Sequence, residues 1–378
     1  MYHVKTMNKI SKIGLAELDE RFEISDTMEH EDAILVRSAK LHDYDFPAEL
    51  KCIARAGAGV NNIPLDRAAD AGIVVFNAPG ANANGVKELT IAALLLASRK
   101  ISQGITWVKE QSAAGADVAA VVEKGKAAYV GPEIMGKTLG VVGLGAIGVL
   151  VANAAAALGM KIVGYDPFLS VTHALNLTPG VEIVDTLPEL YAKADYITLH
   201  LPMNDATRGT LNEAAFAAMK DGVRIVNLAR GELVDTPALK AALDSGKCAA
   251  YVTDFPNSET AAMEGVVAIP HLGASTPESE DNCAMMAARE VKEYLDNGSI
   301  INSVNLPNLT MAWAAKTRVC VISKGADAAA IAGAVPAVAS ASNTRGEYAY
   351  TILDTDAAVD EAAIAAIPGV LRVRVLTR

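Results

Sequence analysis

Two residues with side chains suited to alcohol oxidation follow apolar runs in the second half of the chain. His271 comes after residues 266–269, and Arg230 comes after residues 224–227. A histidine titrates in the range needed to take a hydroxyl proton, and an arginine binds a carboxylate through two parallel hydrogen bonds. Ligands of open α/β sheets bind beyond the carboxyl ends of the strands. The pair therefore indicates chemistry on a hydroxy acid, with a structural histidine and a surface ion pair as the alternatives.

Glu259 is the third catalytic candidate. It ends the segment Asp254-Phe255-Pro256-Asn257-Ser258-Glu259, which follows a predicted strand. A carboxylate beside a histidine raises the pKa of the histidine and fixes its tautomer. The alternatives are a solvated loop charge at Glu259, or Glu264 as the partner in its place.

A glycine-rich loop predicts a dinucleotide site. The run Gly143-Leu144-Gly145-Ala146-Ile147-Gly148 directly follows the predicted strand 138–142 and opens a helix, and Asp166 ends the next strand. Such glycines let backbone N–H groups approach a pyrophosphate at a helix N-terminus. An acidic residue at the second strand end binds the ribose hydroxyls and repels a 2′-phosphate, which favours NAD over NADP. The alternative is a structural turn followed by a surface aspartate.

Two arginines, Arg37 and Arg55, end the predicted strands 34–37 and 52–55. Two guanidinium groups suit a phosphate, and nearby backbone N–H groups add donors for an anion. Alternatively, one or both arginines pair with local carboxylates. Further predicted substrate-binding positions beside them are Ser38, Gly57, Ala58 and Gly59.

The elements that must position these residues form two α/β regions. In the first, the runs 34–37, 52–55 and 73–76 read as buried parallel strands, with a helix over 66–71 and another over 85–98. In the second, helices alternate with strands, which predicts a doubly wound Rossmann-type sheet. Its strands are predicted at 138–142, 161–165, 194–200, 224–227 and 249–254. A further helix is expected to begin at Pro277 and to end before Gly298.

The tail has a different pattern from the two α/β regions. Strands are predicted at 318–323, 347–354 and 370–376, with helices at 326–335 and 360–367 and a turn over 343–346. This pattern favours a small ferredoxin-like βαββαβ module.

Composition narrows the class of protein. Half of the residues are apolar and the net charge is −11, which gives no general attraction to nucleic acid or to an anionic membrane. No apolar run reaches the ~18 residues of a membrane span, and the N-terminus has no signal-peptide core. The four cysteines are isolated, so no metal site and no disulfide is expected. These features predict a cytoplasmic protein.

The chain resembles the D-2-hydroxyacid dehydrogenase family over nearly its whole length. The matching stretches are residues 36–38, 55–62, 77–82, 143–148, 227–231 and 270–276. The resemblance implies that Arg230 binds the substrate carboxylate and carbonyl, that His271 is the acid/base, and that Glu259 is its partner. One departure concerns Glu259, because many relatives have a proline directly after the glutamate and this chain has Thr260.

The resemblance also implies a domain organisation. It predicts a flavodoxin-like substrate domain over 1–88 and 284–306, a Rossmann NAD domain over 89–283, and an ACT-like domain over 316–378. The chain would form a homo-oligomer, a dimer or tetramer. In ACT domains an amino-acid effector binds the loop after the first strand, but this chain has a short loop, 323–327, without the usual Asn and Pro-Gly. The resemblance places further residues near NAD: His200, Pro202, Ala229, Asp254 and Gly273, with Asn82, Asn84 and Val86 near the nicotinamide.

The resemblance, with the paired arginines, implies NAD-dependent oxidation of 3-phospho-D-glycerate to 3-phosphohydroxypyruvate, the first step of phosphorylated serine biosynthesis. One alternative is a dehydrogenase for an unphosphorylated acid such as glycerate or lactate, against which the paired arginines count. The other is a non-catalytic NAD-sensing binding protein, against which Arg230 and His271 count.

Overall fold

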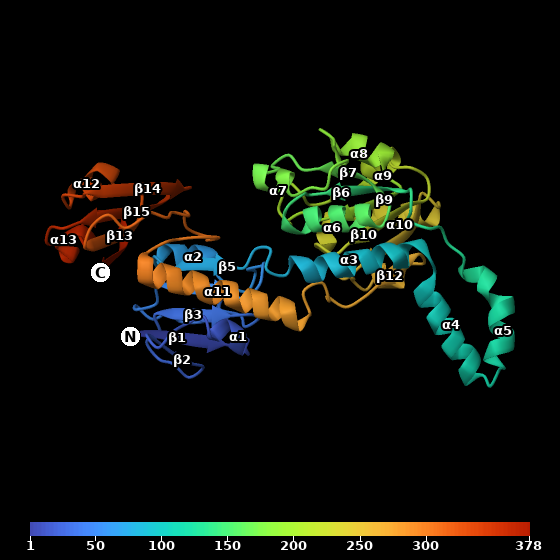
Figure 1. Cartoon of the computed structure of the whole chain (residues 1–378), viewed down its shortest axis with the longest axis horizontal. Coiled ribbons are helices and arrows are strands. Elements are labelled where there is room, and N and C mark those ends of the chain that lie inside the picture. The colour runs from blue at the N-terminus through green and yellow to red at the C-terminus, as the bar shows by residue number, and fades with distance from the viewer. The chain divides into compact units, whose positions relative to one another are not determined.

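The computed structural model describes all residues, 1–378, and divides into two compact units (Figure 1). The first unit combines Met1–Asn82 with Pro277–Arg378, and the second is Ala83–Thr276. Both boundaries fall at the start of a helix, α3 (Ala83–Ser98) or α11 (Pro277–Asn297). Boundaries at 88/89 and 283/284, as predicted from the sequence, would cut both helices.

The first unit contains a five-stranded parallel sheet in the order β2-β1-β3-β4-β5. Its strands are β1 (Tyr2–Met7), β2 (Phe22–Ser25), β3 (Ala33–Val36), β4 (Cys52–Arg55) and β5 (Val74–Asn77), with α1 (Lys12–Leu15) and α2 (Leu65–Asp70) between them. Helix α11 covers one face, burying side chains such as Ala287, Val291 and Tyr294 at helical spacing. Burial on both faces explains why β3 is apolar throughout and why β4 is apolar up to its last residue, Arg55.

The tail of the first unit is a four-stranded antiparallel sheet in the order β14-β15-β13-β16. Its elements are β13 (Thr317–Lys324), α12 (Ala328–Gly333), β14 (Ala339–Arg345), β15 (Tyr348–Thr355), α13 (Glu361–Ala365) and β16 (Val370–Thr377). The βαββαβ connectivity agrees with the prediction. The predicted turn over 343–346 is wrong for its first three residues, which belong to β14; the chain reverses at Gly346, whose φ is +58°.

The tail sheet shares its core with α11. Cys320 and Tyr350 belong to the same apolar cluster as Tyr294 and Leu295 of the helix. Arg374 of β16 is buried and donates hydrogen bonds to the carbonyl oxygens of Tyr294 (3.0 Å) and Leu295 (2.9 Å). Both carbonyls lie in the last turn of α11, where the carbonyl oxygen of Tyr294 also accepts a hydrogen bond from the N–H of Gly298 (2.9 Å). The tail is therefore a built-in part of this unit.

The second unit contains a seven-stranded parallel sheet in the order β12-β11-β10-β9-β6-β7-β8. Its strands are β6 (Thr138–Val142), β7 (Lys161–Tyr165), β8 (Glu182–Ile183), β9 (Tyr196–Leu199), β10 (Val223–Asn227), β11 (Cys248–Thr253) and β12 (Val266–Ala268). Its helices are α3, α6 (Ala146–Ala157), α7 (Val171–Leu175), α8 (Leu187–Lys193), α9 (Glu213–Ala218) and α10 (Thr236–Asp244). Alternate strand residues pack against α3 and α6 on one face and against α8, α9 and α10 on the other (Figure 1).

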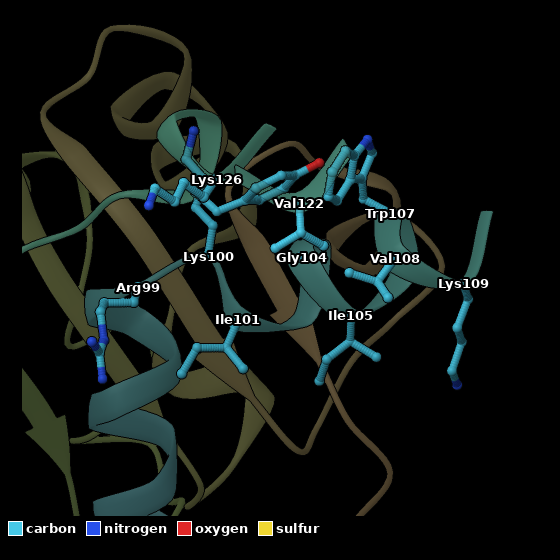
Figure 2. Close-up of a pocket in the computed structure, with 11 residues that line it drawn as sticks. Arg99, Lys100, Ile101, Gly104, Ile105, Trp107, Val108, Lys109, Val122 and Lys126 are labelled. Atoms are coloured by element: carbon cyan, nitrogen blue, oxygen red, sulfur yellow. The ribbon is translucent and has the colours of Figure 1, made fainter. Parts of the chain in front are cut away.

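Three helical segments extend from this unit as an arm: α4 (Ile101–Ala113), α5 (Val118–Gly125) and η1 (Lys126–Tyr129) (Figure 1). None of their residues is buried. An apolar hollow of about 560 Å³ lies on the arm, with Ile101, Ile105 and Val108 along one helix (Figure 2). No helix of the protein combines the length and the apolar character needed to span a bilayer.

Candidate active site

The three glycines of the loop after β6 have different steric surroundings. A Cβ on Gly143, whose φ is +91°, would lie 2.6 Å from the carbonyl oxygen of His200. A Cβ on Gly148 would lie 1.9 Å from the carbonyl oxygen of Gly143, so the start of α6 packs directly on the strand. Gly145 meets nothing within 4 Å and precedes a helix without a side-chain cap. No side chain caps the first N–H groups of α6, which leaves them for an anionic ligand such as a pyrophosphate.

Asp166 follows β7 and holds the same loop. Its Oδ2 accepts a hydrogen bond from the backbone N–H of Leu144, and its Oδ1 accepts one from Phe168, both at 2.8 Å. The carboxylate is half-buried. It therefore lies beside the glycine loop, at the strand end where the sequence predicted a ribose-binding group.

His200 follows β9, the strand next to β6. Burial lowers the pKa of His200 to about 4, so the imidazole is neutral at physiological pH. Its Nε2 lies 3.0 Å from the hydroxyl of Thr198. The remaining predicted cofactor positions, Pro202, Ala229 and Asp254, also follow strands β9, β10 and β11 of this sheet.

The loop that carries Arg230 is shaped by Asn227, a fully buried residue at the end of β10. The amide of Asn227 donates to the carbonyl oxygen of Arg230 (2.8 Å) and accepts from the N–H of Ala229 (3.1 Å). Arg230 forms no ion pair with a carboxylate of the protein. Its half-buried guanidinium is therefore available for an anionic ligand.

Phe255 joins the two main catalytic candidates. The guanidinium carbon of Arg230 lies 5.1 Å from the centre of the Phe255 ring, and the His271 ring centre lies 4.3 Å from it. Arg230 and His271 thus lie at one place in the second unit, as predicted. No role was predicted for Phe255, because the type of a loop residue does not reveal which side chains it contacts.

Asp254 is the buried carboxylate of this region. Its Oδ2 accepts a hydrogen bond from the N–H of Gly273 (3.1 Å), and its Oδ1 has no partner. Burial raises the pKa of Asp254, while the Gly273 N–H and the nearby charge of His271 lower it. Val86 packs close to Gly273, and Asn84 instead bonds to Glu88 at the surface.

Glu259 makes no hydrogen bond to His271. It is exposed, directly before the short helix η3 (Thr260–Ala262), and its N–H donates to the side chain of Asn257. No hydrogen bond or ion pair joins its carboxylate to His271, and Glu264 is likewise exposed. The nearby carboxyl group whose pKa the charge of His271 lowers is that of Asp254.

A second cluster lies within the first unit. Arg37 follows β3 and Arg55 is the last residue of the adjacent strand β4, and the Nε of Arg55 donates to the carbonyl oxygen of Arg37 (3.0 Å). The guanidinium of Arg55 packs against Gly57, where a Cβ would lie 2.5 Å from it. Arg37 forms an ion pair with Glu280 of α11 at 2.6 Å. The prediction that a local carboxylate might pair with one of these arginines is thus correct for Arg37.

Backbone contacts hold the loops around these arginines. The N–H of Ser38 donates to the side chain of Asn8 (3.0 Å), and the carbonyl oxygen of Ala58 accepts a bond from Asn77 (2.6 Å). Gly59 and Asn82 are half-buried at the same carboxyl-end side of the sheet. The predicted substrate positions of this unit, Asn82 aside, gather after strands β3 and β4.

Residues 91–273 match the D-isomer specific 2-hydroxyacid dehydrogenase, NAD binding domain, family. This part of the chain belongs to that family. The NAD-binding domain includes the glycine loop, Asp166, Arg230 and His271, so the open N-terminus of α6 and the carboxylate of Asp166 have a known type of ligand. NAD is the cofactor.

Curated relatives extend the similarity beyond the NAD-binding domain. The chain is 36% identical over 315 residues to D-3-phosphoglycerate dehydrogenase of Methanocaldococcus jannaschii, covering 81% of this chain and 58% of that protein. It is 39% identical over 288 residues to the enzyme of the same name from Archaeoglobus fulgidus, covering 74% and 52%. The chain thus spans between about half and three-fifths of these relatives.

Solved structures have the same architecture. D-mandelate dehydrogenase of Rhodotorula graminis matches with a TM-score of 0.67 and 26% identity, covering 80% of this chain and 97% of that one. NAD⁺-bound 3-phosphoglycerate dehydrogenase of Entamoeba histolytica matches with a TM-score of 0.62 and 26% identity, covering 82% and 99%.

Proposed function

We propose that this chain is an NAD-dependent D-2-hydroxyacid dehydrogenase that oxidises 3-phospho-D-glycerate to 3-phosphohydroxypyruvate, the first step of phosphorylated serine biosynthesis. The observation that carries the proposal is the packing of Arg230 and His271 against one aromatic ring, Phe255, beside the NAD-binding strands. A cation and an acid/base at one place are what oxidation of a hydroxy acid requires.

The chemistry divides between the cofactor and the protein. NAD, held at the glycine loop and beside Asp166, would supply the acceptor for the hydride of the carbon that bears the hydroxyl group. Arg230 binds the carboxylate through charge-assisted hydrogen bonds and steadies the oxygen that becomes the carbonyl. An imidazole nitrogen of His271 takes the hydroxyl proton, so hydride and proton leave the same alcohol in opposite directions.

The partner of His271 is proposed to be Glu259, on the resemblance to the family. Asp254 is the competing partner, because it is buried and the charge of His271 lowers its pKa. The two are separated by comparing Glu259→Gln with Asp254→Asn. The carboxylate that pairs with His271 stabilises the protonated imidazole, so removing that carboxylate should shift the pH profile of kcat/KM. Removing the other carboxylate should change turnover without shifting this profile.

The phosphate of the substrate is proposed to bind Arg37 and Arg55, near Ser38 and the loop 57–59. An uncharged substrate tail would need no such pair of cations. The alternative substrate class is an unphosphorylated acid such as glycerate or lactate.

The test is NADH formation with 3-phosphoglycerate, glycerate and lactate at equal concentrations. The proposal expects 3-phosphoglycerate to have the highest kcat/KM. Arg55→Ala should reduce kcat/KM for 3-phosphoglycerate at least tenfold more than for glycerate. Equal use of the three acids would favour the alternative class, and NAD binding without turnover would favour a non-catalytic binding protein.

We also propose that the tail is an ACT-type module and that the chain forms a homo-oligomer. The βαββαβ connectivity of the tail supports an ACT-type module, and the exposed apolar side chains of the arm, such as Ile105 and Val108, support a homo-oligomer. The homo-oligomer is checked by light scattering of the full chain and of a variant with charged residues at these two positions, and the ACT-type module by titration with L-serine.

A further inference from the structure

We infer that Phe255 is a positioning residue, whose ring holds the Arg230 guanidinium and the His271 imidazole in place and stabilises the positive charge that His271 acquires in the reaction. This inference rests on the proposed function and deepens it. The guanidinium carbon of Arg230 lies 5.1 Å from the centre of the Phe255 ring, and the centre of the His271 ring lies 4.3 Å from it. Both distances are within the ~6 Å over which an aromatic ring attracts a cation. One ring therefore contacts both groups that the proposed reaction needs.

The backbone of Phe255 is held on both sides of the ring. Its N–H donates to the hydroxyl of Thr253 (3.0 Å), a fully buried residue of β11. Pro256 follows directly and restricts the backbone angles of Phe255. The carbonyl oxygen of Phe255 lies close to Gly231, where a Cβ would be 3.2 Å from it. The loop after β11 thus packs on the loop that carries Arg230, and these contacts fix where the ring stands.

The charges around His271 show what the ring adds. When His271 takes the hydroxyl proton, it becomes a second cation on the ring that Arg230 already contacts, and the two cations repel each other. Asp254 is the buried carboxyl group nearby, and Glu259 is exposed and makes no bond to His271. The face of an aromatic ring carries partial negative charge, so Phe255 stabilises both cations. A carboxylate in its place would pair with Arg230 and compete with the substrate carboxylate.

The test compares Phe255→Leu, which keeps an apolar side chain but lacks the ring, with Phe255→Tyr, which keeps the ring. Phe255→Leu should lower kcat/KM roughly five- to thirtyfold, the effect of losing two contacts between a cation and a ring. The loss should be the same for 3-phosphoglycerate and glycerate, because Arg230 binds the carboxylate that both acids share. The kcat should fall because the charge on His271 appears only during the reaction, and the KM should rise because Arg230 already binds the ground state. Phe255→Tyr should stay within about threefold of the wild type.

The pH dependence separates positioning from simple packing. The ring stabilises the protonated imidazole, so its loss should move the acidic limb of the kcat/KM profile about 0.4–0.7 pH unit towards lower pH. The same shift should appear in an NMR titration of the His271 imidazole in the free full chain, which needs neither NAD nor substrate. Phe216→Leu is the matched control, because it makes the same substitution at a buried residue of α9 in the same unit. It should lower the urea midpoint and leave both pH readouts unchanged.

An unmoved acidic limb and an unmoved His271 titration in Phe255→Leu would overturn the inference. A Phe255→Tyr variant as impaired as Phe255→Leu would also overturn it, because the ring would then not be what matters. Failure of the proposed function looks different. The wild type would then oxidise none of the three acids, while the His271 titration would still move in Phe255→Leu.

Discussion

Glu290 is a buried carboxyl group in the middle of α11, and replacing it should change how stability depends on pH. The residue is 6% exposed. Its Oε1 accepts a hydrogen bond from the amide of Asn302 (2.7 Å), and its Oε2 is buried without a partner. Burial raises the pKa of Glu290 to about 8 from its ordinary value of 4.5. The native protein therefore holds a proton here at neutral pH that the unfolded chain releases.

The sign and size of the effect follow from this difference. Between pH 4.5 and about 8 the native state binds one more proton than the unfolded state, so the free energy of unfolding falls as pH rises. At about 1.4 kcal/mol per pH unit the full interval corresponds to roughly 5 kcal/mol, an upper limit for a site that can relax. Glu290→Gln keeps the acceptor for Asn302 and carries no proton to lose. The variant should match the wild type near pH 4.5 and exceed its stability by roughly 2–5 kcal/mol at pH 9.

Urea unfolding of both proteins at several pH values from 4.5 to 9 is the measurement, followed by circular dichroism. Glu293→Gln is the matched control, since Glu293 is on the same helix and is half-buried, with a bond from Asn297. The control should follow the pH dependence of the wild type. Parallel curves for wild type and Glu290→Gln would show that Glu290 ionises normally and that the reasoning from burial is wrong.

Four further outcomes are expected. His271→Ala should reduce kcat by roughly 10²–10⁴ without a large change in NADH affinity by fluorescence titration; near-normal turnover would remove it from the mechanism. Asp166→Ala should weaken NAD binding and reduce the preference over NADP, because the ribose acceptor and the repulsive charge are lost together; equal use of NADP by the wild type would contradict this. Arg318→Leu leaves Asp354, its fully buried ion-pair partner, without a cation, and should cost about 3–5 kcal/mol of stability, read as a lower urea midpoint; an unchanged midpoint would count against it. L-serine should inhibit weakly or not at all, because the loop 323–327 lacks the usual polar effector contacts; inhibition at micromolar serine in a subsaturating assay would refute this.

The parts of the fold with strong apolar runs were predictable. Strands β4, β6 and β7 were predicted with the bounds that the structure has, because each is a short apolar or glycine-bearing run between turn signals. Strands β1 and β14 were missed. The first mixes polar and apolar residues, and the second, Ala-Ser-Ala-Ser-Asn-Thr-Arg, is mostly exposed and has no hydrophobic alternation.

The candidate site was predictable for those residues whose role follows from their type and from their position directly after a strand. Arg230 and His271 were placed in this way, and the structure brings them together on Phe255. Contacts between loops were not predictable. The exposed position of Glu259, the Arg37–Glu280 ion pair and the shared core of tail and α11 all depend on tertiary packing that a single sequence does not encode locally.

The first unit combines segments from the two ends of the chain, so it cannot be completed before the last segment has been synthesised. Residues 1–82 supply the parallel sheet with α1 and α2, and the long helix α11 that covers one face of the sheet belongs to Pro277–Arg378. The inserted segment Ala83–Thr276 is continuous and has its own sheet and core. All residues of this segment are synthesised before the first unit is complete. Until α11 emerges, the nascent N-terminal sheet keeps an apolar face exposed, a surface that chaperones recognise and that aggregation exploits.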